Sequence, residues 1–183
     1  MDSKTSLQIM GISGSLRSGS SNTNLLRALS GLAPKGMDIE IFGGIGDLPH
    51  FNPETDDDPP AKVTLFRERI QASDGLIIST PEYARGVPGV LKNALDWLVP
   101  SGELYEKPVM VISASPMETG GDKAFDSLLL TLGMMTVRIA PNGAICIPFA
   151  NKKVNAEGEI TDEPLKEKLT SMLIQLECEV MKR

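Results

Sequence analysis

Two continuous apolar runs constrain the fold of this chain more than any other feature. They occupy residues 75–80 and 109–114 and read GLIIST and VMVISA. Neither run alternates apolar with polar residues, so we expect two strands that are buried on both faces, as in a parallel sheet covered by helices. Parallel neighbours need a crossover of a dozen or more residues, usually a helix. The runs therefore predict an α/β fold.

The rest of the chain fits this alternation. Further strands are predicted at 7–12, at 38–42 and within 136–147, where an interruption is expected around 141–143. Helices are predicted at 23–33, 61–72, from 87 onward, at 122–134 and at 162–181, with Asn22 and Thr161 as N-caps of the first and last. A long irregular loop is expected at 43–60. Five strands alternating with five helices predict a three-layer domain with helices on both faces of the sheet.

Length and charge narrow the class of protein. The chain has 183 residues, which suits one domain over 1–183, and its formal net charge is −6. An acidic chain without a basic run is unsuited to neutralising phosphates along a nucleic acid, so no nucleic-acid partner is expected. No apolar stretch approaches the ~20 residues of a membrane span, and no signal peptide is recognisable. We expect a cytoplasmic protein without a membrane partner.

The histidine, cysteine and serine residues of the chain argue against a metal site and against a catalytic triad. His50 is the single histidine, and Cys146 and Cys178 form no CxxC pair, so we expect no metal centre and interpret both cysteines as buried thiols. No serine lies in a GxSxG elbow. The acidic run at 56–58 is a possible metal site, but a solvated loop before a helix is the favoured interpretation.

Three polar loops follow predicted strands, at the edge of the sheet where α/β proteins bind ligands. The first, at 14–23, combines several hydroxyls with Arg17 and the start of a helix, whose free N–H groups attract anions. It lacks the Gly-Lys pair of a Walker A loop and the GxGxxG spacing of a dinucleotide site. It is either a phosphate cradle or a plain capped turn.

The second loop, at 80–89, contains two prolines and two glycines. A backbone held this rigidly can present N–H and C=O groups to the edge of a planar heterocycle, with Tyr83 or Arg85 against its face. The third loop, at 113–121, is also polar and rich in glycine. On its own it is weak evidence, but it completes a pocket formed with the other two.

These three loops carry a family resemblance. GSLRSGSSN, PEYARGVPGVLKNALDW and SASPMETGG resemble the signatures of the NADPH-dependent FMN reductase family, over roughly residues 7–147. That family has a flavodoxin-like fold and includes bacterial quinone, chromate and azo-dye reductases. The resemblance implies strand order 2-1-3-4-5, FMN as a non-covalent cofactor and NADPH or NADH as the electron donor.

The resemblance also implies a mechanism and a set of contact residues. Electrons would pass in a ping-pong reaction from NAD(P)H to the flavin and on to quinones, azo or nitro compounds, metal oxyanions or free flavin. The flavin carries the chemistry, so no catalytic side chain is expected. The implied FMN contacts are Ser15, Arg17, Ser20, Ser21, Asn22 and Thr23 for the phosphate, Pro81, Glu82, Tyr83 and Ala84, largely by backbone, for the ring and ribityl chain, and Ser113, Ser115 and Gly120 to close the site.

Three positions depart from the family pattern. The family usually has asparagine where this chain has Ala84, often serine where it has Gly86, and a more flexible loop where it has Pro116. Two alternatives stay open: a flavodoxin-type electron carrier and, because the amide is missing, a non-enzymatic flavin-binding protein.

The resemblance also bears on NADPH binding and on assembly. Arg17, or Arg85 at the rim, is the candidate for attracting the NADPH phosphates. The family usually assembles as dimers or tetramers. We expect the same here, with Trp97 and Leu98 as exposed apolar residues near the interface.

Overall fold

The structure is a computed structural model that describes residues 6–182, and it confirms the predicted sheet. Five parallel strands pair in the order β2-β1-β3-β4-β5. The strands are β1 (Leu7–Ser13), β2 (Met37–Phe42), β3 (Gly75–Thr80), β4 (Pro108–Ala114) and β5 (Arg138–Ile147). The helices are α1 (Ser21–Leu32), α2 (Ala61–Ala72), α3 (Gly89–Asp96), α4 (Asp122–Met134), α5 (Ala150–Lys153) and α6 (Glu163–Met181).

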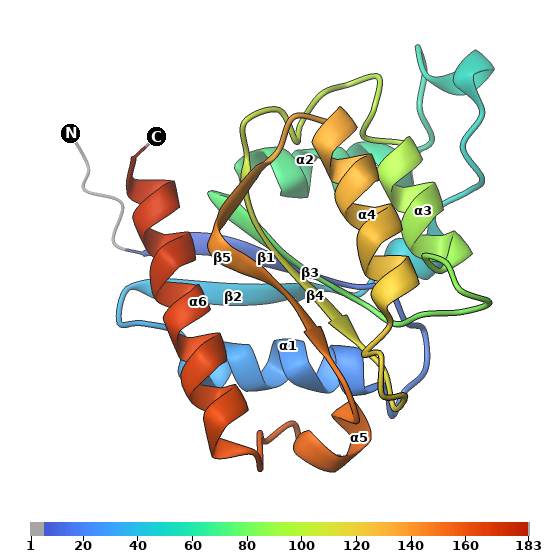
Figure 1. Ribbon diagram of the computed structural model, residues 1–183. Coiled ribbons are helices and arrows are strands. Elements are labelled where there is room, and N and C mark those ends of the chain that lie inside the picture. Colours follow the sequence, from blue (N-terminus) through green and yellow to red (C-terminus); the bar gives the residue numbers. More distant parts are fainter. Residues whose placement is uncertain (1–5, 183) are drawn as a thin grey trace.

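Helices cover both faces of the sheet, as predicted (Figure 1). Helices α2, α3 and α4 pack on one face around Phe66, Ile78 and Val111. Helices α1 and α6 pack on the other around Leu25, Ile77 and Leu173. Every residue of β3 and β4 is buried, because these strands contribute side chains to both cores.

Two predicted caps are wrong by one or two residues. Helix α1 begins at Ser21, and Ser20 rather than Asn22 accepts from the backbone of its first turn, at 3.2 Å from the Asn22 nitrogen. Helix α6 is capped by Asp162 rather than Thr161, through the Leu165 amide at 2.9 Å. In both cases a chemically suitable neighbour occupies the capping position, and sequence alone does not choose between adjacent polar residues.

The predicted exposure of Trp97 and Leu98 is wrong. Both lie just beyond the end of α3, and their exposed fractions are 0% and 1%. The Trp97 indole donates to the Pro49 carbonyl at 2.8 Å and packs edge-on against Phe51. The long loop before α2, which includes short 3₁₀ turns at Ile45–Asp47 and Pro53–Thr55, therefore folds over these side chains.

The cysteine prediction is also wrong. Cys146 is only partly buried, and Cys178 on α6 is exposed.

The interruption predicted in the last strand is confirmed. The pairing of β4 with β5 shifts register between Val109 and Val111, opposite a left-handed Asn142 (φ 53°). The short helix α5, which follows this strand, was not predicted.

Two further findings concern the described part of the chain. None of its helices combines the length and apolarity needed to cross a membrane. Within residues 6–182, no three His, Cys, Asp or Glu side chains gather as a metal site would require. In the acidic run at 56–58, the Asp56 carboxylate accepts from the Arg67 guanidinium at 2.6 Å.

Candidate functional site

The three polar loops meet at one edge of the sheet. Ser13, Ser79 and Ile112 are register partners on β1, β3 and β4, so the loops that follow these strands leave the sheet side by side. A hollow of about 200 Å³ opens between them. Its walls are formed by Ser15, Arg17, Ser20, Ser21, Asn22, Pro81, Glu82, Tyr83, Ala114, Ser115, Pro116 and Met117.

The first loop leaves hydrogen-bond donors free. Within residues 6–182, the amides of Ser18, Gly19 and Ser21 have no protein acceptor, and the exposed guanidinium of Arg17 has no ion-pair partner. Helix α1 begins here with no acidic side chain in its first turn. The partial positive charge of the helix N-terminus therefore adds to the charge of Arg17. This arrangement suits an anion such as a phosphate.

Other side chains of the first loop are used to fix its shape. The buried Asn22 amide group donates to the Ala114 carbonyl at 3.0 Å and accepts from the Ser79 hydroxyl at 2.9 Å, which ties α1 to β3 and β4. The Thr23 hydroxyl bonds the Ser13 hydroxyl at 2.8 Å. Asn22 thus borders the hollow with its side-chain amide already bonded to β3 and β4, and Thr23 lies outside its lining.

The second loop contains a tight hairpin turn. Tyr83 and Gly86 exchange two backbone hydrogen bonds of 3.1 and 3.0 Å, and the central residues Ala84 and Arg85 have φ of 49° and 59°. Two successive left-handed residues are the pattern of a type I′ turn, which favours asparagine and glycine. The Tyr83 hydroxyl reaches the Ser15 hydroxyl at 3.3 Å, which connects the second loop to the first.

The third loop is bonded internally, and helix α4, which follows it, is bonded to the second loop. The Ser113 hydroxyl is fully buried and donates to the carbonyls of Gly120 and Gly121 at 2.9 and 3.0 Å. The Glu82 carboxylate accepts from the amides of Lys123 and Ala124 at 2.9 and 3.0 Å. Few side-chain groups of these two loops are therefore left for a ligand, which would meet backbone and ring surfaces.

The lining separates the predicted residues into two groups. Nine of the thirteen border the hollow. Thr23, Ala84, Ser113 and Gly120 do not, and Ser113 instead fixes the backbone of the third loop. The sequence prediction missed Ala114, Pro116 and Met117, although all three lie in the predicted third loop and could have been inferred from their place around Ser115.

The surroundings of the third loop are acidic. Lys123 holds the pKa of Asp122 below its ordinary value, mainly through a side-chain hydrogen bond, and Asp122 raises the pKa of Lys123 in the same way. Burial, together with Asp126, Asp122 and Glu82, raises the pKa of the Cys146 thiol to about 11. The thiol is therefore neutral near pH 7.

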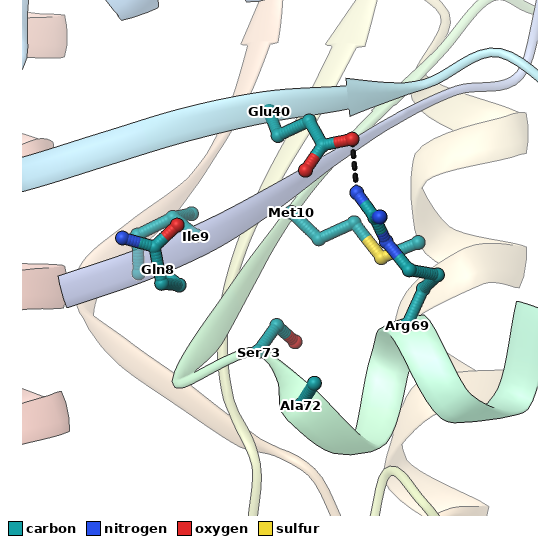
Figure 2. Close-up of a pocket in the computed structure, with 7 residues that line it drawn as sticks. All are labelled: Gln8, Ile9, Met10, Glu40, Arg69, Ala72 and Ser73. Atoms are coloured by element: carbon teal, nitrogen blue, oxygen red, sulfur yellow. Dashed lines mark ion pairs between the residues drawn. The ribbon is translucent and has the colours of Figure 1, made fainter.

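A second hollow, of about 260 Å³, lies toward the opposite ends of the strands. Figure 2 shows it between β1, β2 and the end of α2, where the Arg69 guanidinium pairs with the Glu40 carboxylate. The Ser73 hydroxyl there donates to the Ile70 carbonyl at 2.7 Å. Its polar groups already have partners, and ligands of such sheets bind beyond the carboxyl ends of the strands. The three-loop hollow is the stronger candidate.

Comparison with known proteins finds similar sequences along most of the chain. The model of a family described as NADPH-dependent FMN reductase matches residues 7–152, a range that contains all three loops. The chain is 37% identical to an NAD(P)H-dependent FMN reductase of Pseudomonas aeruginosa, over 93% of this chain and 94% of that protein. It is 33% identical to a quinone reductase of Escherichia coli, over 91% and 92%.

A solved structure is also similar along nearly its whole length. The flavoenzyme NAD(P)H:(acceptor) oxidoreductase FerB of Paracoccus denitrificans superposes with a TM-score of 0.85 at 31% identity. The match covers 96% of this chain and 98% of that one.

Proposed function

The chain belongs to the NADPH-dependent FMN reductase family, and on this basis we propose that its three-loop hollow holds FMN for a ping-pong transfer of electrons from NADPH to a small acceptor. It is an oxidoreductase that uses FMN and NAD(P)H. The proposal concerns where the cofactor lies, the order of the two half-reactions and the class of acceptor. We take residues 1–183 as a single domain.

The free donors of the first loop are the observation that carries this proposal. The amides of Ser18, Gly19 and Ser21 and the guanidinium of Arg17 belong to the loop before α1 and its first residue, and they have no protein acceptors in the described chain. A phosphate is the group of FMN that needs such donors, because charge-assisted hydrogen bonds are about twice as strong as neutral ones. Ser15, Ser20, Asn22 and Thr23 then shape the cradle, partly through the bonds described above.

The second and third loops would hold the ring and the ribityl chain. Pro81, Glu82 and Tyr83 border the hollow on one side and Ser115 on the other. Ala84 and Gly120 lie outside this surface, and Ser113 fixes the backbone behind it through the glycine carbonyls. The ring is planar and uncharged in the oxidised flavin, so shape and backbone donors suffice for it.

Bound FMN would supply the redox chemistry, with NADPH as the hydride donor and a quinone, an azo or nitro compound, a metal oxyanion or free flavin as the acceptor. The chain's own residues bind and orient the cofactor, and fixed backbone dipoles near the ring stabilise negative charge there. No side-chain acid is required for this. Arg17, or Arg85 on the exposed turn, is the candidate to attract the NADPH phosphates.

We also propose a homodimer or homotetramer. Because Trp97 and Leu98 are buried, they do not mark the interface, and the support is family membership alone. Sedimentation at micromolar concentration measures the assembly directly, and a monomer throughout would contradict it.

An anaerobic experiment tests the reductase assignment. The protein is loaded with FMN, separated from free flavin and mixed with NADPH while the flavin absorbance is followed. We expect rapid bleaching, followed by reoxidation when a quinone is added. Retained flavin that stays yellow would indicate a carrier or a protein without reductase activity. Failure to retain flavin would contradict FMN as a bound cofactor.

A further inference from the structure

The residue at the N-cap position of α4 has no side chain with which to cap the helix. Gly121 occupies the N-cap position with φ of 85°, and it has no side chain to accept from the first turn. A Cβ atom at this position would lie 2.5 Å from the Ser113 hydroxyl oxygen and 3.3 Å from the Glu82 Cβ. The tight packing and the left-handed backbone both require glycine, so the cap must come from elsewhere.

Glu82 provides this cap from a different loop. One oxygen of its carboxylate accepts from the backbone amides of Lys123 and Ala124 at 2.9 and 3.0 Å, across 41 and 42 residues of sequence. These are the second and third residues of α4, whose amides have no partner within the helix. A carboxylate at the N-terminus of a helix is also favoured by the helix dipole.

The second loop is thereby held at two points on opposite sides of the hollow. Glu82 ties it to α4 and the third loop, and the Tyr83 hydroxyl reaches Ser15 in the first loop at 3.3 Å. The backbone of Pro81, Glu82 and Tyr83 spans the distance between these attachments. Its position relative to the third loop therefore depends on the bonds that Glu82 makes.

We propose that Glu82 is a positioning residue, which sets the spacing of the two loops that flank the flavin ring by capping α4 with its side chain. This inference rests on the proposed function, because it assumes that FMN occupies the three-loop hollow. The glutamate side chain acts through the helix and the loop backbone, while the first loop keeps its phosphate donors independently of it.

Helix stabilisation alone does not account for this arrangement. Asp122 already places a carboxylate in the first turn of α4, where it pairs with Lys123 at 3.0 Å. Asp122 belongs to α4 itself and, within residues 6–182, forms no hydrogen bond or ion pair with the second loop. It is thus a matched control, with the same charge at the same end of the same helix but without the connection between loops.

The test compares Glu82→Ala, Glu82→Gln and Asp122→Asn with the parent protein. Hydrogen exchange of the apoproteins reports the cap directly. We expect faster exchange at 81–86 and 122–125 in Glu82→Ala only.

FMN titration, the visible circular dichroism of bound flavin and its midpoint potential then report the ring environment. In Glu82→Ala we expect about a tenfold rise in the Kd for FMN, because the free energy of one N-cap corresponds to about a tenfold change in an equilibrium constant. We also expect an altered spectrum and an altered midpoint potential in this variant.

Glu82→Gln and Asp122→Asn distinguish a positioning role of Glu82 from a purely stabilising one. A glutamine oxygen can still accept from both amides, so Glu82→Gln should recover most of the parent spectrum and potential. Asp122→Asn should match the parent in both. Equal spectra and potentials in Glu82→Ala and Asp122→Asn would overturn the positioning role, even with FMN bound. If the parent protein binds no FMN, the proposed function fails, and the exchange data still show separately whether the cap exists.

Discussion

Two helices begin at the same edge of the sheet, and their N-termini differ in what they leave free. At α1, the first turn has no acidic side chain, and amides of the preceding loop have no protein acceptor within residues 6–182. At α4, Glu82 accepts from two first-turn amides and Asp122 adds a second carboxylate. One helix end can receive an external anion, whereas the other is already neutralised by the chain.

Because of this difference, we expect the first loop to bind the phosphate and the other two loops to contact the ring. The first loop presents positive charge and free donors, as a phosphate requires. In the second and third loops, Glu82 accepts from amides of α4 and Ser113 donates to carbonyls of its own loop, which fixes a backbone surface for a planar ring. Affinity and ring geometry should therefore respond to different substitutions.

The largest expected effect comes from the glycines. Gly121→Ala forces a Cβ against Ser113 in a left-handed backbone, so we expect a loss of about 3 kcal/mol in the free energy of unfolding. Gly19→Ala in the first loop meets open space within 4 Å and should change it by less than about 0.5 kcal/mol. Urea denaturation of both variants measures this. Equal losses would show that the two loops are packed alike.

Arg17→Ala addresses the first loop alone. Loss of a charged donor should weaken FMN binding by about 2 kcal/mol, or roughly thirtyfold, with unchanged stability of the apoprotein because the side chain is exposed. Fluorescence titration and thermal melting give the two values. Arg27→Ala, on helix α1 that follows this loop but outside the hollow, is the control. An unchanged FMN affinity in Arg17→Ala would remove this residue from the phosphate site.

A smaller effect is expected at the hairpin turn. Ala84 has φ of 49°, a conformation that asparagine adopts more readily than alanine. Ala84→Asn should raise the free energy of unfolding by about 0.5 to 1 kcal/mol, and Ala84→Val should lower it. Denaturant midpoints of the pair test this. A destabilising asparagine would mean that the left-handed turn is not strained.

The smallest effect concerns a thiol beside the third loop. Burial and the neighbouring carboxylates raise the pKa of Cys146 to about 11, so its reactive thiolate is scarce at pH 8. Mass spectrometry during alkylation should find exposed Cys178 labelled first. Since the unfolded chain ionises this thiol at lower pH than the folded one, the contribution of Cys146 to stability should fall as pH rises from about 9 to 11. Equal labelling of both cysteines at pH 8 would contradict the raised pKa.

Much of the fold was predictable because local patterns and packing agree in the central strands. The runs at 75–80 and 109–114 are apolar except for Ser79, Thr80 and Ser113 near their ends, and β3 and β4 are buried throughout. The loops were predictable because polar, glycine-rich segments follow those strands. Trp97 was predicted as exposed because periodicity shows which face of a helix is apolar but not that a distant loop covers the residues beyond its end.

The division of roles within the site was not predictable from sequence. Glu82, Asn22 and Ser113 were all expected to contact the cofactor. In the structure, Glu82 caps a helix, Asn22 joins two strands and Ser113 holds two glycine carbonyls. Each role depends on a partner 7 to 92 residues away, and only the folded chain brings those partners within hydrogen-bond distance.

The central claim is that the free donors at the start of α1 bind the phosphate of FMN. Parallel titrations of the apoprotein with FMN and with riboflavin, which lacks the phosphate, test it most directly. We predict that FMN binds at least about a hundredfold more tightly, as loss of two charge-assisted hydrogen bonds would require. Equal affinities for the two flavins would contradict the account.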